Sequence, residues 1–134
     1  MIVLDTSALV AILLDEPGAN GLLDAIETAD AVAISAGTLA ECFVVAKGKN
    51  IASEMRALLT AIAPVVLDVD EVAAERIGDG YAVWGKGFHP ARLNFGDMFA
   101  YDATTSLGAP LLFVGEDFAG TDVAPALAQN GETP

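Results

Sequence analysis

The chain has 134 residues, of which 54% are hydrophobic and 19% are charged. This length is typical of one domain and leaves no room for separate substrate and cofactor modules. The hydrophobic fraction is too high for a disordered chain and large enough to form a buried core. We therefore expect residues 1–134 to form a single folded domain.

The composition also excludes several classes of protein and site. The apolar start, residues 1–14, contains Asp5 and no basic residue, and it is shorter than the ~20 residues of a membrane-spanning helix. We therefore expect it to be neither a signal peptide nor a membrane anchor. Cys42 is the only cysteine and His89 the only histidine, which excludes an intramolecular disulfide and metal sites built from several cysteines or histidines. A lone cysteine agrees with a reducing, cytoplasmic location.

Charge is unevenly distributed along the chain. The net charge is −13, and all six Lys and Arg residues lie between positions 47 and 92. The segments 1–46 and 93–134 contain acidic residues but no Lys or Arg. Either these two segments form a solvated acidic surface, or they fold together into a carboxylate-lined site for a cation. The net negative charge by itself would repel nucleic acid.

In chain order, short apolar strands alternate with helices. Runs of mainly branched apolar residues predict strands at 2–4, 31–35, 65–67 and 110–114. Helical spacing predicts helices at 8–14, after the cap-type residues Thr6 and Ser7, and at 20–29, 38–47, 51–62, 70–84 and 95–107. Residues 85–94 form a loop, and the tail from Thr121 holds at most a weak apolar patch. This alternation predicts an α/β fold, with a central parallel sheet of four to five strands flanked by helices.

Four acidic residues follow predicted strands or lie in the first turn of a helix: Asp5, Glu41, Asp97 and Asp117. Ligands of parallel sheets bind outside the carboxyl ends of the strands, so we expect these side chains to meet at one edge. Two carboxylates ~4 Å apart repel by roughly 4 kcal/mol at an effective dielectric of 20, so such a cluster requires protonation or a bound cation. Oxygen ligands suit Mg²⁺ or Mn²⁺, whose natural chemistry is phosphoryl or phosphodiester transfer.

Each of these acids also has a purely structural explanation. Thr38 to Glu41 matches a capping box, and Asn94 to Asp97 has the same arrangement with a shorter acid. Any carboxylate in the first turn of a helix is favoured by the helix dipole. Asp102 lies about 140° further round the helix than Asp97 and should point away from the site.

Several segments, in this order, resemble one known family: Met1 to Ala8, Glu41, Leu93 to Asp97 with Phe99 to Tyr101, and Leu111 to Phe118 followed by Thr121 and Asp122. The opening Asp-Thr-Ser-Ala is weak by itself, whereas Asn-Phe-Gly-Asp and Gly-x-Asp-Phe at this spacing are specific in combination. The chain resembles the PIN-domain ribonucleases over nearly its whole length. Among them it is most similar to the VapC-type toxins of bacterial type II toxin–antitoxin pairs.

The resemblance implies a single PIN domain with endoribonuclease activity that depends on Mg²⁺ or Mn²⁺. RNA cleavage by metal-activated water would leave 5′-phosphate and 3′-hydroxyl ends and inhibit translation. The resemblance also implies a homodimer and a cognate VapB-type antitoxin. The implied catalytic and metal-binding residues are Asp5, Glu41, Asp97 and Asp117. Surrounding positions that support them are expected at Thr6, Ser7, Asn94 and Glu116, although a helix cap explains Thr6 and Ser7 equally well.

Only the basic central segment of the chain can supply contacts to RNA phosphates. The expected contacts are Lys47, Lys49, Arg56, Lys86 and Arg92, for which solvated surface charge is an equally simple explanation. Three aromatic residues in this segment could stack on bases, but aromatic side chains more often serve packing: Tyr81, Trp84 and Phe88. We expect His89 to be a loop residue without a chemical role.

Other functions remain open at this point. A PIN-like domain could bind RNA or a protein partner without cutting RNA. A phosphoaspartate receiver domain also places acids around Mg²⁺, but it needs a lysine after a late strand, and no Lys or Arg follows Arg92. A phosphatase of the haloacid-dehalogenase type needs a second acid two residues after Asp5, where this chain has Ser7.

Overall fold

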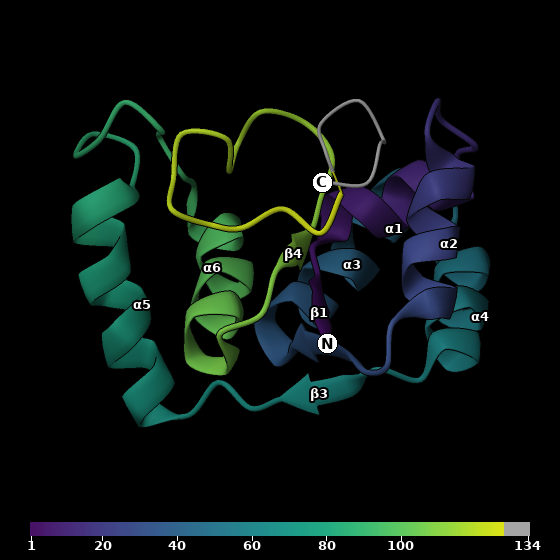
Figure 1. Ribbon diagram of the computed structural model, residues 1–134, viewed down its shortest axis with the longest axis horizontal. Coiled ribbons are helices and arrows are strands. Elements are labelled where there is room, and N and C mark those ends of the chain that lie inside the picture. The colour runs from purple at the N-terminus through teal and green to yellow at the C-terminus, as the bar shows by residue number, and fades with distance from the viewer. Residues whose placement is uncertain (128–134) are drawn as a thin grey trace.

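The computed structural model describes residues 1–127, which form a parallel four-stranded sheet surrounded by helices (Figure 1). The strand order is β3-β2-β1-β4. The strands are β1 (Ile2–Leu4), β2 (Val32–Ser35), β3 (Val65–Leu67) and β4 (Leu111–Leu112). The helices are α1 (Thr6–Leu13), α2 (Ala19–Thr28), α3 (Ala36–Gly48), α4 (Ala52–Ile62), α5 (Glu71–Trp84) and α6 (Phe95–Leu107). The predicted α/β fold with a parallel sheet is confirmed.

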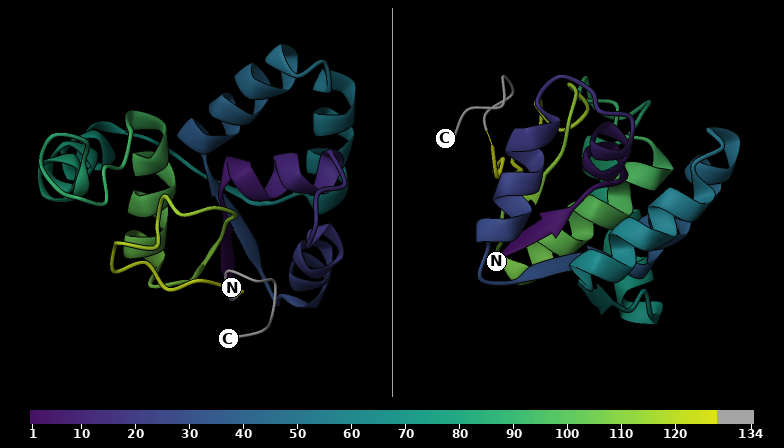
Figure 2. Two further views of the ribbon diagram at one scale, coloured as in Figure 1. Left: turned by 90° about the horizontal axis from the view of Figure 1, so that it is seen from above. Right: turned by 90° about the vertical axis from the view of Figure 1, so that its right-hand side faces the viewer.

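Each face of the sheet has its own hydrophobic core. Side chains alternate across a strand, so Val3 and Leu111 face one side while Leu4 and Leu112 face the other. Helices α5 and α6 cover the first side, and residues of α1, α2, α3 and α4 form the core on the second (Figure 2). All four side chains are fully buried, and each stabilises the fold by roughly 1.5–3 kcal/mol.

Helices α1 and α3 begin two residues earlier than predicted, because a residue at or just after the end of the preceding strand caps each of them. Ser35 ends β2, and its hydroxyl accepts a hydrogen bond from the Gly37 N–H, so α3 begins at Ala36. The capping box predicted at Thr38 is therefore wrong: Thr38 is fully buried inside α3, and Glu41 lies in its second turn. In the same way, Asp5 caps α1, so Thr6 and Ser7 are not caps but the first residues of the helix.

The predicted loop before α6 is closed at its base by the backbone. The Leu93 N–H donates to the Trp84 carbonyl at 3.1 Å, and the Lys86 N–H donates to the Leu93 carbonyl at 2.9 Å. The Leu93 side chain is fully buried in the core that α5 and α6 form on their side of the sheet. The loop therefore has a fixed exit, which starts α6 at Phe95 as predicted.

The tail packs more closely than predicted as far as residue 127. The Leu111 N–H donates to the Ala124 carbonyl at 2.9 Å, and the Ala126 N–H donates to the Leu111 carbonyl at 2.8 Å. Val123 packs on the core below α5 and α6, and Leu127 packs on the opposite core. The tail thus extends the sheet beside β4. In residues 1–127, no helix combines the length and apolar character needed to span a membrane.

A glycine brings α3 and α6 close together. A Cβ atom at Gly37 would overlap the ring of Phe99, which packs edge-on against Phe95 with ring centroids 5.0 Å apart. Helix α3 carries Glu41 and α6 carries Asp97. The contact at Gly37 therefore sets the separation between two of the predicted site residues.

We expect Gly37→Ala to lower the free energy of unfolding by about 1–3 kcal/mol, because the added methyl group overfills the contact with Phe99. Gly48→Ala, in the same helix, has open space around the new methyl and should leave stability unchanged or raise it by about 0.5–1 kcal/mol. Urea denaturation of both variants measures the difference. Equal effects would contradict the close approach of the two helices.

Candidate functional site

Asp5 lies at the carboxyl end of β1 and is held by its own helix. Its Oδ2 atom accepts hydrogen bonds from the Ser7 N–H at 3.1 Å and from the Ser7 hydroxyl at 2.6 Å. The Ser7 hydroxyl also accepts from the Val114 N–H at 3.0 Å, which connects α1 to the segment after β4. Burial raises the pKa of Asp5, while the hydrogen bonds from Ser7 oppose that increase.

Glu41 projects from α3 toward the starts of both α1 and α6. The Thr6 hydroxyl donates to Glu41 Oε1 at 2.6 Å. The other oxygen lies against Gly96, where any Cβ atom would collide with it. Glycine at position 96 thus gives the Glu41 carboxylate room beside Asp97. The carboxylate is not part of a helix cap, so the structural explanation predicted for Glu41 is wrong.

Asp97 combines the predicted cap with a place in the acidic cluster. Its N–H donates to Asn94 Oδ1 at 2.9 Å, and its Oδ2 accepts from the Asn94 N–H at 3.0 Å, which completes the capping box. Burial raises the pKa of Asp97 to about 7, and the charges of Asp117, Asp5 and Glu41 add to the increase. The capping explanation is confirmed for Asp97, and it does not exclude a second role.

Asp117 lies in an exposed turn after β4. The next residue, Phe118, is buried and packs on Phe113 with ring centroids 5.3 Å apart. The charge of Asp117 raises the pKa of both Asp5 and Asp97, so its carboxylate lies within the range at which it repels theirs. Glu116, in the same turn, is exposed, and its side chain makes no hydrogen bond to the residues described.

The structure therefore brings the four predicted acids near one another without basic partners. Ion pairs among residues 1–127 join the N-terminus to Asp30 and Arg76 to Asp102, and neither involves the four acids. In their present conformations, no three acidic, His or Cys side chains of this part of the chain are close enough to hold one metal ion. Side-chain rotations would be needed to form a complete binding site.

The donor chemistry of the cluster nevertheless fits a divalent cation. One oxygen each of Asp5, Glu41 and Asp97 is engaged by Ser7, Thr6 or Asn94, and the other takes no hydrogen bond from residues 1–127. Carboxylate oxygens are the donors that Mg²⁺ and Mn²⁺ prefer. A cation would also offset the repulsion that raises the pKa values of Asp5 and Asp97.

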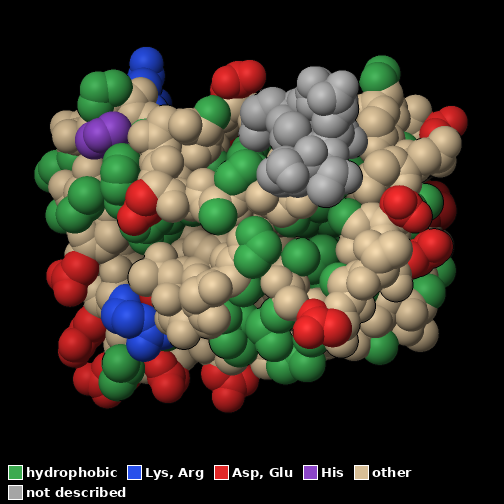
Figure 3. All heavy atoms as spheres, in the orientation of Figure 1, with side chains coloured by type: hydrophobic (Ala, Val, Ile, Leu, Met, Phe, Trp, Pro, Cys, Tyr) green, Lys and Arg blue, Asp and Glu red, His purple; other side chains and the backbone are tan. Residues whose placement is uncertain are grey.

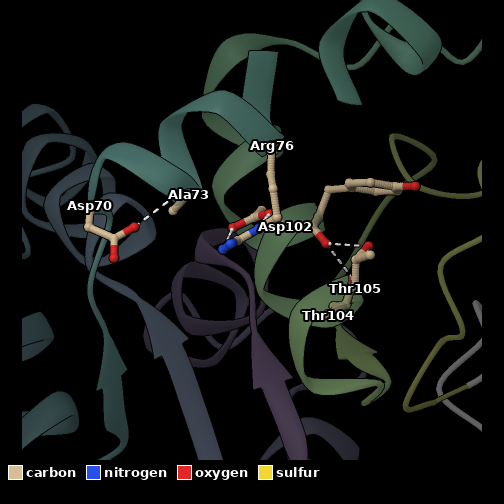
Figure 4. Close-up of polar contacts among 7 residues, drawn as sticks. Asp70, Ala73, Arg76, Asp102, Thr104 and Thr105 are labelled. Atoms are coloured by element: carbon tan, nitrogen blue, oxygen red, sulfur yellow. Dashed lines mark hydrogen bonds and ion pairs between the residues drawn. The ribbon is translucent and has the colours of Figure 1, made fainter. Parts of the chain in front are cut away.

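Asp102 points away from the cluster, as predicted. Its carboxylate accepts two hydrogen bonds from Arg76 of α5, at 2.8 and 3.0 Å (Figure 4). This ion pair joins α5 to α6 and neutralises Arg76. The charge of Arg76 therefore contributes little to any attraction of RNA.

The predicted RNA contacts lie in two places away from the acids. Lys47 and Arg56 line a hollow of about 700 Å³ between α3 and α4, where the Arg56 guanidinium lies 5.0 Å from the Phe43 ring centroid. Lys86 and Arg92 line a second hollow of about 520 Å³ in the loop before α6. Lys49 caps the end of α3. On the face drawn in Figure 3, blue Lys and Arg side chains appear only on the half that contains α5.

The aromatic residues of the central segment serve mainly packing. The Trp84 indole N–H donates to the Tyr101 hydroxyl at 2.9 Å, and its ring packs on His89 with centroids 4.6 Å apart. Tyr81 packs edge-on against Phe88 at 5.9 Å. The structure thus gives His89 a packing role within the loop. Phe88 is 66% exposed, which leaves its ring accessible.

The sequence did not indicate three further features of this region. Gly96 makes room for Glu41, Thr38 has a buried hydroxyl without a hydrogen-bond partner in the described chain, and Tyr101 bonds to Asp122. Only Tyr101 left a usable signal, because it lies four residues after Asp97 and so shares its helix face. The other two depend on contacts between segments far apart in the sequence.

Without metal, we expect Asp97→Asn to be more stable than the original protein at pH 8. At pH 5 the difference in stability between the two proteins should be smaller. The folded-state pKa of Asp97 is raised from 3.8 to about 7, so the folded protein binds more protons than the unfolded chain within this range. Its stability therefore falls as the pH rises from about 4 to about 7. Asparagine keeps the acceptor for the Asn94 N–H. Thermal unfolding in EDTA at both pH values tests this, and a destabilised variant at pH 8 would contradict it.

Comparison with known proteins identifies the family to which this chain belongs. The PIN domain family profile matches residues 2–124. Ribonuclease VapC of Mycolicibacterium smegmatis is 41% identical over 127 residues, which cover 91% of this chain and 97% of the relative. Ribonuclease VapC30 of Mycobacterium tuberculosis is 39% identical over 127 residues, with 91% and 95% covered.

Solved structures share the same fold. VapC20 of Mycobacterium tuberculosis, described as a sarcin-ricin loop cleaving toxin, has a TM-score of 0.73 at 15% identity and covers 92% of this chain and 97% of its own. VapBC2 from Rickettsia felis, bound to a DNA fragment from its promoter, has a TM-score of 0.67 at 18% identity, with 93% and 96% covered. The chain belongs to the PIN-domain family and, within it, to the VapC ribonucleases.

Proposed function

We propose that the protein is the toxin of a VapBC-type toxin–antitoxin pair and cleaves RNA internally with the help of a divalent metal ion. The observation that carries this proposal is the cluster of four carboxylates near one another with no basic side chain paired to them. The ribonuclease names of the relatives support RNA as the substrate. Inhibition of translation by RNA cleavage would place the protein in the cytoplasm.

The metal ion, Mg²⁺ or Mn²⁺, would be held by Asp5, Glu41, Asp97 and Asp117. When bound, it would lower the pKa of a water molecule and stabilise negative charge on the phosphodiester. Ser7, Thr6 and Asn94 would orient three of the carboxylates through the hydrogen bonds that they make. Glu116, exposed beside Asp117, would act only at a distance. The cleaved RNA would end in a 5′-phosphate and a 3′-hydroxyl.

We expect Asp5→Asn and Asp97→Asn each to lower kcat for RNA cleavage by at least about 100-fold, because each removes a metal-binding charge. Asp102→Asn is the matched control: it lies on the same helix as Asp97 but faces Arg76, and it should keep nearly full activity. Cleavage with Mg²⁺ or Mn²⁺, followed by mapping of RNA 5′ ends, measures all three variants.

Undiminished cleavage by Asp97→Asn would contradict the proposed role of the cluster. A protein that binds RNA but cuts it with neither ion would instead be a PIN-like binding module. The same assay therefore separates the proposed function from its main alternative.

We further propose that RNA phosphates contact Lys47, Lys49 and Arg56 on one side and Lys86 and Arg92 on the other. The first group lies by α4 and the second in the loop between α5 and α6, at opposite ends of the molecule (Figure 1). RNA that lies across the acidic cluster would meet basic side chains on both sides. Such contacts would offset the repulsion between the acidic protein and the RNA backbone.

We expect the double variant Lys86→Ala, Arg92→Ala to raise KM for RNA roughly 5- to 30-fold and leave kcat nearly unchanged, because two exposed phosphate contacts are lost. In a plot of the logarithm of the RNA-binding constant against the logarithm of the salt concentration, the magnitude of the slope should fall by about 1.4. Arg76→Ala is the control, since its charge is already paired with Asp102. An equal KM change in both variants would contradict a specific role for the loop.

We also propose a VapB-type antitoxin as partner and a homodimer as the assembled state. A toxin–antitoxin complex from Klebsiella pneumoniae has a TM-score of 0.66 at 20% identity, covering 91% of this chain and 93% of its own. The acidic cluster would attract a basic antitoxin segment. For the homodimer, the edge strand β3 and the start of α5 offer apolar surface, with Val65 60% and Val72 61% exposed.

A further inference from the structure

A hydrogen bond outside the acidic cluster anchors the turn that carries Asp117. The Tyr101 hydroxyl donates to Asp122 Oδ1 at 3.0 Å. Asp122 directly follows the turn 116–121, in which the Ala119 N–H donates to the Glu116 carbonyl and the Thr121 N–H to the Phe118 carbonyl, each at 3.1 Å. The turn is therefore compact, and a contact at its end affects the position of Asp117.

Trp84 fixes the direction of the bond between Tyr101 and Asp122. The indole N–H of Trp84 donates to the Tyr101 oxygen at 2.9 Å. An indole N–H is a donor only, so the proton of the Tyr101 hydroxyl remains available for Asp122. Burial, together with the bond to Asp122, raises the pKa of Tyr101, which keeps the hydroxyl protonated at neutral pH.

One face of α6 both holds the turn and faces its acidic side chain. Tyr101 lies four residues after Asp97, so the two side chains share that face. Tyr101 binds Asp122 at the end of the turn, whereas the charge of Asp97 repels that of Asp117. The opposite side of the turn is fixed by Phe118, which is buried in the core.

Asp117 depends on these anchors because its own side chain has none. It is exposed and makes no hydrogen bond to residues 1–127, in contrast to Asp5, Glu41 and Asp97. Like-charge repulsion from Asp97 and Asp5 tends to push it away from the cluster. The position of Asp117 therefore depends on the backbone of the turn and on the contacts of Phe118 and Asp122 that fix it.

We propose that Tyr101 and Asp122 are positioning residues, which hold the turn 116–121 against α6 and so keep Asp117 beside Asp97. The proposal rests on the proposed function for the role of Asp117 in binding metal. Neither residue needs to touch metal or RNA. What matters at position 122 is an oxygen that accepts the Tyr101 proton, and the negative charge of Asp122 is not required.

The experiment compares five variants with the original protein: Tyr101→Phe, Asp122→Ala, Asp122→Asn, Asp117→Asn and the double variant Asp117→Asn, Tyr101→Phe. Amide hydrogen exchange of residues 115–121 reports on the turn without metal or RNA. Binding of Mn²⁺ reports on the site without catalysis. It is measured as the loss of the free-ion signal in electron paramagnetic resonance. The rate of RNA cleavage against metal concentration completes the set.

We expect Tyr101→Phe and Asp122→Ala to speed exchange in the turn, to weaken Mn²⁺ binding and to lower kcat by about 10- to 100-fold, with little change in KM. Asp122→Asn keeps the acceptor oxygen, so its exchange in the turn, its Mn²⁺ binding and its kcat should match those of the original protein. In the Asp117→Asn background, Tyr101→Phe should weaken Mn²⁺ binding no further, because the two residues act through the same ligand.

The proposal would be overturned if Tyr101→Phe left exchange in the turn and Mn²⁺ binding unchanged. It would also be overturned if Asp122→Asn were as harmful as Asp122→Ala, since Asp122 would then act through its own charge. An original protein that binds Mn²⁺ but cuts no RNA would overturn the proposed function instead, and exchange and Mn²⁺ binding would still decide the role of Tyr101.

Discussion

Mutual repulsion among four carboxylates is the constraint on which the rest of the site depends. Asp5 and Asp97 are buried, and the charges of their acidic neighbours raise their pKa values further. No basic side chain of residues 1–127 forms an ion pair with them. The fold therefore keeps together charges that would separate in a free chain, and it does so by fixing the backbone from which each one projects. A divalent cation is the natural partner for such an arrangement.

The backbone is fixed largely by helix caps that serve two purposes. Asp5 caps α1 and Asp97 completes the capping box of α6, so each acid stabilises the helix whose start places it in the cluster. Glu41 has no cap to hold it and depends instead on Thr6 and on the space beside Gly96. Stability and the proposed chemistry thus use the same carboxylates, with one oxygen in a hydrogen bond and the other left for a cation. This dual use explains why a capping explanation and a functional one can both hold for Asp97.

Local patterns in the sequence predicted most of the fold. The strands at 2–4 and 65–67 and the helix at 95–107 were predicted with the bounds that the structure has. The start of α3 was missed because Ser35 both ends a strand and caps a helix. The predicted strand at 110–114 retains only Leu111 and Leu112. The tail packs beside β4 through hydrogen bonds to Leu111, and no local pattern in the sequence reveals that contact.

The four acids stood out as candidates in the sequence, because the predicted elements placed them just after strands or at the starts of helices, at the edge of the sheet where ligands bind. Contacts between distant segments were not identifiable, such as that between Tyr101 and Asp122 or between Glu41 and Gly96. Such contacts arise only when α6 packs against the rest of the fold.

Anomalous X-ray scattering from crystals soaked in Mn²⁺ tests the central claim most directly. The account predicts a manganese peak bounded by carboxylate oxygens of Asp5, Glu41, Asp97 and Asp117, with the side chains rotated toward it. Crystals that show no peak there at saturating Mn²⁺, from a preparation that cleaves RNA, would contradict the account.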